Sequence, residues 1–327
     1  MTTARSLLVD FDSPGYYHCI SRCVRRAWLC GIDPYDGKSY EHRREWVELR
    51  LLELAEIFAV DIYAYAVMSN HVHVVVRIDP GVAVAWSPED VAARWVRLFP
   101  ATVDGEVDPP ACQTKAQNLL GNAERLEICR QRLGNLAWFM RSLNEPIARR
   151  ANREDACTGR FFEGRYKCQA LLDDAAVLTC MSYVDLNPIR AGIAENLEGS
   201  SHTSALHRVL QVKSDTRYAG QPLCCIRSSL SSPALPLTVA DYLEVIDWTA
   251  RLTRADKRGA INAAEPTILR KLGLTERQWS AQVLGTETRY WRAIGSAQSL
   301  IAKAAAIGQR WLKGIGTAES LIRLKPT

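Results

Sequence analysis

The sequence lacks any run of about 20 consecutive apolar residues, the length that a membrane-spanning helix needs. It also lacks a C-x2-C pair among its ten cysteines, which excludes zinc fingers and zinc ribbons and favours reduced, mostly buried thiols. No fixed-period repeat is present, which excludes solenoids and propellers. The opening MTTARSLLVDFDSPG contains no long apolar segment. We therefore expect a cytoplasmic protein with no membrane partner.

A strong charge imbalance is absent as well. The 41 Lys and Arg residues against 36 Asp and Glu residues leave a net charge of +5, and the pI is near 8.7. Such a mild excess permits a phosphate-backbone partner without requiring one. The 327 residues are 47% hydrophobic, which is ordinary for a globular protein and enough for two domains or one domain with a large appendage.

Hydrophobic patterning predicts a β-α-β-β beginning. Aromatic and β-branched runs indicate strands, and apolar residues at helical spacing indicate a helix. The predicted elements are strands at 16–24, 60–68 and 71–78 and a helix at 41–58. Ser69 and Asn70 form the turn between the second and third strands. On the helix, Arg43 and Arg44 lie on the charged side, which we expect to face solvent.

The rest of the chain divides into a core and two additions. Prolines, including the DPP at 108–110, interrupt the pattern over about 79–135, which we interpret as an insertion in a core spanning 1–200. The expected elements are helices near 90–98, 122–133, 136–153 and 173–188 and a strand at 159–172. The Ser/Pro content of 201–237 is typical of a linker. The last segment, 238–327, has mainly helical patterning and is expected to cap the core by default, with DNA binding as the alternative.

The third predicted strand, HVHVVVRI, carries two histidines two positions apart. Side chains in a strand alternate sides, so His71 and His73 point together while Val72 and Val74 point the other way. Two neutral imidazoles on one side suit a divalent metal ion. Two satisfied core histidines are the alternative. A histidine-triad nucleotide hydrolase is disfavoured, because Val75 stands where a third histidine would be.

The helix expected at 173–188 carries Tyr183 and Asn187 four residues apart, on one side of the helix. An amide one turn beyond a tyrosine can supply a third metal ligand and hold the phenol near the ion. A structural tyrosine followed by a helix-ending Asn-Pro turn explains the same residues. Asp173 or Asp174 is the expected N-cap, and Pro188 is expected to break or kink the helix.

Three ordered motifs, MSNHVHVVV, GRFFEGRYKCQALL and YVDLNPIRAG, resemble those of the REP-associated tyrosine transposases, which belong to the HUH single-tyrosine transposases. The opening YYHCISRCVRRAW is similar to the first strand of that family, and the resemblance covers about residues 14–195. It implies an α+β fold, with a ferredoxin-like or palm-like antiparallel sheet and helices on one face. The insertion and the C-terminal extension exceed the minimal family core.

The resemblance implies specific roles for residues of this chain. His71, His73 and Asn187 are implied ligands of Mg²⁺ or Mn²⁺, and Tyr183 is the implied nucleophile. Attack by the tyrosine on a phosphodiester of single-stranded or hairpin DNA, of the REP repeat type, gives a 5′-phosphotyrosine and a free 3′-hydroxyl that can later reseal the bond. Lys167 and Arg190 are candidates to assist deprotonation of Tyr183. Small family members form homodimers with shared active sites, so the oligomeric state stays open.

A basic and aromatic stretch is expected to contact the DNA. Cations bind phosphates and rings stack on bases in single-strand recognition. The residues are Arg141, Arg149, Arg150, Arg153, Arg160, Arg165, Lys167, Phe161, Phe162 and Tyr166, with Arg22, Arg25, Arg26 and Arg190 as extensions of the patch. A solvated helix with ordinary core aromatics is the alternative.

Three functions stay open on these observations. The first is a metal-dependent DNA nuclease and strand transferase, either a mobile transposase or a domesticated relative that processes host repeats. The second is a non-catalytic regulator that binds hairpin DNA or RNA on the same core. The third is a metal-dependent phosphohydrolase that uses water, with Tyr183 incidental.

Overall fold

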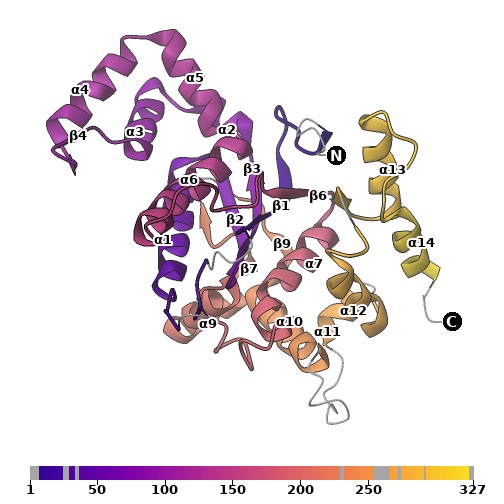
Figure 1. The fold of residues 1–327 in the computed structure, drawn as a ribbon. Helices are drawn as coiled ribbons and strands as arrows, with labels where there is room; N and C mark the ends of the chain where they lie inside the picture. The colour runs from indigo at the N-terminus through magenta and orange to yellow at the C-terminus, as the bar shows by residue number, and fades with distance from the viewer. Residues whose placement is uncertain are drawn as a thin grey trace.

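The computed structural model describes residues 7–24, 29–33, 37–228, 232–253, 266–271, 274–290 and 292–323. Within these residues the centre of the protein is a six-stranded sheet in the order β10-β6-β1-β3-β2-β8 (Figure 1). Neighbouring strands are antiparallel except for β10 and β6, which are parallel. The α+β prediction is therefore confirmed, whereas a ferredoxin-like or HUH topology stays a prediction.

The strands of the sheet are β1 (Gly15–Arg22), β2 (Val60–Val67), β3 (His71–Ile78), β6 (Lys167–Leu171), β8 (Arg227–Ser228) and β10 (Ala293–Ile294). The first three confirm the strands predicted from sequence. Met68 N donates to His71 O at 2.9 Å and closes the predicted turn between β2 and β3. The tight connection places the histidine pair at the very start of β3.

Strand register sorts the side chains onto two sides of the sheet. Ile20 of β1 pairs with His73, and His18 pairs with Val75 on β3 and with Gln169 on β6. Because residues two apart share a side, His18, His71, His73 and Gln169 all lie on one side, which we call the histidine face. Val72, Val74 and Val76 lie on the other side, the valine face.

Helices α1 (His42–Ile57) and α6 (Leu136–Glu154) cover the valine face. Tyr65, paired with Val74 on that face, donates its hydroxyl to Glu48 Oε1 of α1 at 2.6 Å. Asn144 of α6 donates to Ser21 Oγ at 2.8 Å. Helix packing on this side buries the three valines in the core.

The charged side of α1 is not solvated as expected. Arg43 is fully buried and Arg44 nearly so. Arg43 Nε donates to Glu154 Oε2 at 2.8 Å, and Arg44 Nε donates to Glu41 Oε2 at 2.6 Å. The prediction was wrong because the end of α6 brings acceptors that let the guanidinium of Arg43 be buried with its charge paired.

Helix α7 (Asp174–Asp185) packs against the opposite side of the sheet, so helices cover both faces rather than one. Asp173 is the N-cap, and its carboxylate accepts from Ala176 N at 2.9 Å. An apolar stripe on this helix, formed by Val177, Met181 and Val184, is fully buried. The helix ends before Pro188, which lies in the short helix α8 (Asn187–Arg190), as the expected break predicts.

The insertion forms a helical lobe that extends away from the sheet at the upper left of Figure 1. Its elements are α2 (Pro80–Ala85), α3 (Pro88–Leu98), β4 (Thr102–Val103), β5 (Glu106–Val107), α4 (Pro109–Leu120) and α5 (Ala123–Leu133). The helices expected near 90–98 and 122–133 are confirmed. The DPP stretch begins α4 instead of breaking the pattern, because Asp108 caps the helix and Pro109 occupies a first-turn position that needs no amide hydrogen.

The strand expected at 159–172 is shorter in the structure. Only the end of that stretch is strand, as β6, and residues 159–166 form a loop before it. Gly159 and Gly164 have φ angles of +105° and +147°, which extended strands do not contain. Glu163 N donates to Arg22 O at 2.8 Å and holds the loop beside the end of β1.

The segment 201–237 is more ordered than the linker predicted from its Ser and Pro content. It contains α9 (Ser204–Ser214), the 3-10 helix η2 (Thr216–Gly220), β7 (Pro222–Leu223), β8 and most of β9 (Leu235–Thr238). Strand β8 pairs with β2 at the edge of the central sheet. Pairing with the sheet, which composition alone does not reveal, accounts for the difference.

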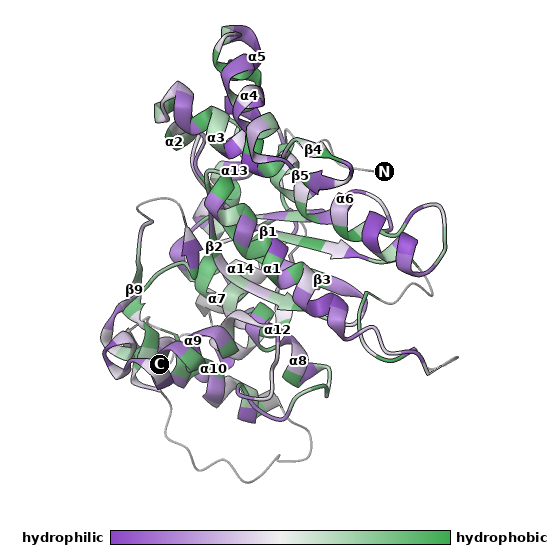
Figure 2. Ribbon diagram, turned by 90° about the vertical axis from the view of Figure 1, so that its left-hand side faces the viewer, coloured by the Kyte–Doolittle hydropathy of each residue, from purple (hydrophilic) through white to green (hydrophobic). Residues whose placement is uncertain are grey.

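The C-terminal segment is mainly helical, as predicted, and joins the core. Its helices are α10 (Val239–Thr253), α11 (Thr267–Lys271), α12 (Glu276–Gly285), α13 (Ala297–Ala306) and α14 (Ile315–Arg323). Strand β10 extends the sheet beside β6, and α12 packs on α7. Figure 2 shows hydrophobic residues concentrated in the central strands and hydrophilic ones along the outer helices. No helix in the described ranges is long and apolar enough to cross a membrane.

Candidate functional site

The histidine face carries three buried or half-buried imidazoles at its centre. His18 Nε2 lies 2.9 Å from His73 Nδ1, and the two rings stack with centroids 5.2 Å apart. The His71 and His73 rings meet edge to face at 4.6 Å. His18 is fully buried and His73 is 1% exposed, whereas His71 opens partly to solvent. The sequence prediction that His71 and His73 point together is therefore confirmed.

In both histidines of the pair, the Nδ1 atom is hydrogen-bonded to another side chain. His71 Nδ1 lies 2.6 Å from Asn70 Oδ1, and His73 Nδ1 contacts His18. His73 Nε2 is buried and has no hydrogen-bond partner among the described residues. A buried polar atom without a partner is costly and is uncommon in folded proteins. The unpaired Nε2 is therefore the first sign of a ligand site.

Burial sets the protonation state of the cluster. It lowers the pKa values of His18 and His73, and it lowers the pKa of His71 to about 4, where the nearby charge of Arg22 acts in the same direction. All three imidazoles are therefore neutral at physiological pH. Neutral imidazole is the form that binds metal ions.

Tyr183 lies on the same side of the sheet as the histidines. Its ring centroid is 5.8 Å from that of His73 and 6.2 Å from that of His18, and its side chain is 4% exposed. The Arg190 guanidinium lies 4.5 Å from the tyrosine ring centroid. Burial and the Glu287 carboxylate raise the pKa of Tyr183 to about 12, while Arg190 acts against that shift.

Asn187 is buried one turn beyond Tyr183, but its amide points along its own helix. Asn187 Nδ2 donates to Tyr183 O at 3.0 Å. This bond continues the helix hydrogen-bonding across the junction before Pro188, where the proline removes a backbone donor. The role of Asn187 as a third metal ligand stays a prediction that this contact does not favour.

A cavity of about 860 Å³, which we call the groove, opens beside His71 at the ends of β1, β3 and β6. The residues that line it include seven predicted DNA-contacting residues, Arg22, Arg160, Phe161, Phe162, Arg165, Tyr166 and Lys167, and the carboxylates of Glu163 and Glu287. A second hollow of about 420 Å³ shares Phe162, Arg165 and Tyr166 and adds Arg141 from α6. The structure thus gathers most of the predicted basic and aromatic stretch next to one histidine of the pair.

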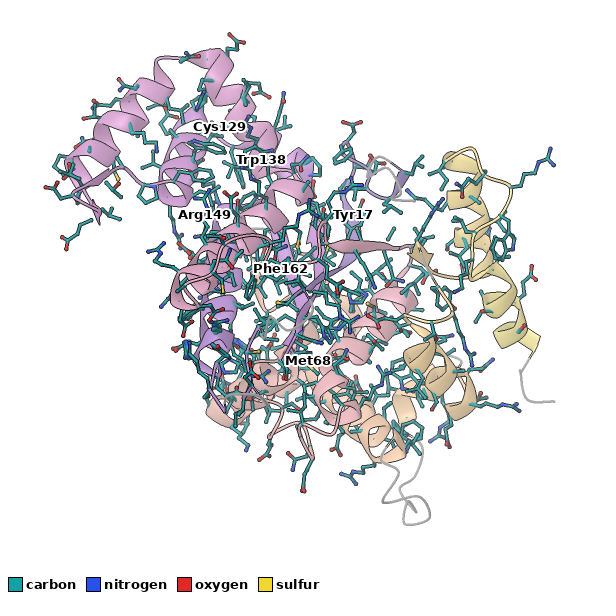
Figure 3. The ribbon with its side chains drawn as sticks, viewed as in Figure 1. Tyr17, Met68, Cys129, Trp138, Arg149 and Phe162 are labelled. Carbon is teal, nitrogen blue, oxygen red and sulfur yellow. The ribbon has the colours of Figure 1, made fainter. Side chains whose placement is uncertain are left out.

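The remaining cations of α6 lie outside the residues that line this groove. Arg149 pairs with Glu145, and the Arg150 guanidinium stacks on Trp46 of α1 at 3.7 Å from the ring centroid. Figure 3 labels Arg149, on α6, and Phe162, near the middle of the view. Arg153 is exposed in the last turn of α6. Arg25 and Arg26 lie outside the described residues.

The cluster fits a divalent metal only in part. Its two adjacent neutral imidazoles, with the unpartnered Nε2 of His73, are suitable nitrogen ligands. Among the residues that the structure describes, no group of three or more His, Cys, Asp or Glu side chains could hold a metal ion. A bound ion would therefore draw its further ligands from water, substrate oxygens or an amide such as that of Asn187.

Sequence reasoning missed His18, Gln169 and Glu287. His18 sits in the predicted first strand, but its position beside His73 depends on a strand register that the sequence does not state. Gln169 lies within the predicted strand at 159–172 and has no motif of its own. Glu287 comes from the turn after α12, more than a hundred residues from Tyr183, with no local signal.

Comparisons with known proteins add one distant likeness. No protein-family model matches this chain, and no curated protein matches it. Among solved structures, it is similar to a REP-associated tyrosine transposase bound to a REP hairpin, with a TM-score of 0.33 and 9% sequence identity, over 72% of this chain and 98% of that one. A likeness this distant establishes neither the family nor the activity.

Proposed function

We propose that this protein cleaves and rejoins single-stranded or hairpin DNA, with Tyr183 as the nucleophile and a divalent ion, Mg²⁺ or Mn²⁺, held by His71 and His73. The observation that carries the proposal is the position of Tyr183, which lies over the histidine face 5.8 Å, ring to ring, from His73. That histidine keeps a buried Nε2 atom without a partner. A phenol beside an imidazole pair with free ligand capacity suits metal-assisted phosphoryl transfer.

The chemistry follows from the residues present. When bound, the ion would withdraw charge from the scissile phosphate and orient it. The oxygen of Tyr183 attacks phosphorus and forms a 5′-phosphotyrosine, the bond to the 3′ oxygen breaks, and that oxygen takes a proton and leaves as a 3′-hydroxyl. The phenolic proton needs an acceptor, and the acceptor in this proposal is the Glu287 carboxylate, whose charge raises the pKa of the phenol. Arg190, over the tyrosine ring, stabilises the developing phenolate.

The groove supports a single-stranded substrate. Arg165 and Lys167 are exposed cations at its wall, and Phe162 and Tyr166 are half-buried rings of the same lining. Cations that follow the phosphate backbone and rings that stack on bases are the two components of single-strand binding. An unpaired strand, unlike a duplex, can present its bases to these rings while its phosphates approach His71.

The test is the covalent intermediate itself. The protein is incubated with Mn²⁺ and an end-labelled single-stranded hairpin oligonucleotide, and a denaturing gel is inspected for a protein–DNA adduct. Tyr183→Phe should abolish the adduct, because the attacking oxygen is removed, while DNA binding persists. Tyr166→Phe is the matched control, since it removes another phenol at the groove and should leave the adduct.

Other outcomes identify the alternatives. Cleaved DNA without an adduct, in the parent and in Tyr183→Phe alike, would indicate a phosphohydrolase that uses water. Hairpin binding without any cleavage, with either metal ion, would indicate a regulator on a non-catalytic core. Each result contradicts the tyrosine mechanism.

A further inference from the structure

Three buried side chains, those of His73, His18 and Gln169, form a hydrogen-bonded series across the histidine face. His73 Nδ1 contacts His18 Nε2 at 2.9 Å, and His18 Nδ1 contacts Gln169 Oε1 at 3.0 Å. Gln169 is 6% exposed, and its amide nitrogen donates to the carbonyl oxygen of Thr286 at 3.4 Å. The series therefore joins β3 through β1 and β6 to the turn after α12.

The carbonyl of Thr286, at the end of this hydrogen-bonded series, determines which atom is the donor in each of its hydrogen bonds. A backbone carbonyl only accepts, so the NH₂ group of Gln169 faces Thr286 and its oxygen faces His18. That oxygen also only accepts, so His18 carries its proton on Nδ1 and presents a bare Nε2. His73 must then donate from Nδ1, which leaves its Nε2 without a proton.

His71 reaches the same state by a separate contact. Its Nδ1 lies 2.6 Å from Asn70 Oδ1, an acceptor, so its proton is on Nδ1 and its Nε2 is bare. Both histidines of the pair therefore present lone pairs rather than N–H groups. Only a bare ring nitrogen can bind a metal ion, and the hydrogen bond made by the other nitrogen decides which one is bare.

We propose that His18 and Gln169 are positioning residues that hold His73 in the Nδ1–H tautomer, with Nε2 free to bind a metal ion. The tautomer itself is independent of catalysis, and only the identity of the ligand taken up by Nε2 rests on the proposed function. The last side chain of the series, Gln169, is a neutral amide. The series therefore fixes the orientation of the His73 ring without a carboxylate of its own. It also makes the C-terminal segment, through Thr286, part of the support of the site.

A matched pair of variants separates this role from simple packing. Gln169→Leu removes the acceptor for His18 while keeping a similar volume, and Gln169→Glu keeps an acceptor there. Loss of a partner behind a metal-binding histidine lowers metal affinity by about 10- to 100-fold. We expect that loss of Mn²⁺ affinity for Gln169→Leu. We expect affinity at or above the parental value for Gln169→Glu, because a carboxylate behind the series raises ligand basicity.

The decisive measurement needs neither DNA nor metal. The chain has six histidines, so long-range nitrogen–proton NMR correlations on ¹⁵N-labelled, metal-free protein resolve the tautomer of each ring. His71→Gln and His73→Gln variants assign the two signals of interest. The expected result is Nδ1–H for His73 in the parent and in Gln169→Glu, and a mixture of tautomers in Gln169→Leu. Calorimetric Mn²⁺ titration of the same preparations gives the affinities.

Several results would overturn the proposal. An Nε2–H tautomer of His73 in the parent protein would do so at once, even if Gln169→Leu fails to fold. An unchanged tautomer and unchanged Mn²⁺ affinity in folded Gln169→Leu would do so as well. If the tautomers respond as expected but no Mn²⁺ binds and no DNA adduct forms, the proposed function fails while the positioning role stands.

Discussion

The two sides of strand β3 differ in what they bury. On the valine face, Val72, Val74 and Val76 are nearly or fully inaccessible and pack under α1 and α6. On the histidine face, His73 is equally inaccessible but keeps a ring nitrogen without a partner. Helices thus cover both sides of this strand, but the buried side chains are apolar on one side and include a polar imidazole on the other.

The contrast separates stability from function. Buried valines gain free energy from the apolar surface that they remove from water. A buried imidazole with an unpaired nitrogen gives up part of that gain, since the nitrogen has lost its hydrogen bond to water. On β3 the protein tolerates that loss at His73, beside Tyr183, and the valines on the other side carry no polar side-chain atom. Unpaired polar atoms kept in a well-packed interior are typical of sites that await a ligand.

The largest expected effect comes from substituting two adjacent residues on opposite sides of β3, His73 and Val74. His73→Asn should reduce Mn²⁺-dependent adduct formation by about a hundredfold or more, because one metal ligand is lost. The asparagine amide can still donate to His18 Nε2, so we expect the free energy of unfolding to fall by only about 1 kcal/mol. Val74→Ala should instead lower it by about 2 kcal/mol through the cavity it leaves, with the adduct retained. Urea unfolding and the gel assay measure both quantities.

A reversed result would contradict the division of roles. Parental adduct formation by His73→Asn would show that this imidazole does not serve the reaction. Loss of the adduct in a stably folded Val74→Ala protein would show that the valine face contributes to the site as well.

The sequence predicted the site as far as local periodicity reaches. The alternation of His71 and His73 along one strand, and the position of Tyr183 on a helix, follow from spacing within single elements. Contacts between elements do not follow from spacing. His18 joins the cluster through strand register, and Arg43 is buried because the end of α6 supplies Glu154.

The effect of a proline or glycine on secondary structure also depends on its position in the element. Pro109 suggested a break, yet proline in the first turn begins a helix when an aspartate such as Asp108 caps it. The reverse holds at residues 159–166, where Gly159 and Gly164 end a pattern of aromatic residues that suggested a longer strand. At Pro109 the deciding factor is a first-turn position that needs no amide hydrogen, and at Gly159 and Gly164 it is a positive φ angle. The hydrophobic pattern contains neither.

A smaller effect is expected where the groove meets the histidine face. Arg165→Ala and Lys167→Ala should each weaken single-strand DNA binding and reduce the salt dependence of log K by about 0.7 per lost phosphate contact. Arg149→Ala is the control, since Arg149 lies on the helix over the valine face and pairs with Glu145. Fluorescence anisotropy across a salt series measures both slopes. An equal loss for Arg149→Ala would place the DNA over α6 instead of in the groove.

The smallest expected effect concerns the Tyr183 phenol. Burial and the Glu287 carboxylate raise its pKa to about 12, because a nearby negative charge disfavours phenolate. Glu287→Gln removes that charge, so the pKa should fall and Tyr183 should ionise at lower pH. Tyrosinate absorbance, taken as the difference between each protein and its Tyr183→Phe counterpart, isolates this residue. Glu163→Gln removes another groove carboxylate, one that does not act on Tyr183, and should leave its titration unchanged. Equal titrations for all three proteins would mean that the C-terminal turn does not reach the histidine face in solution.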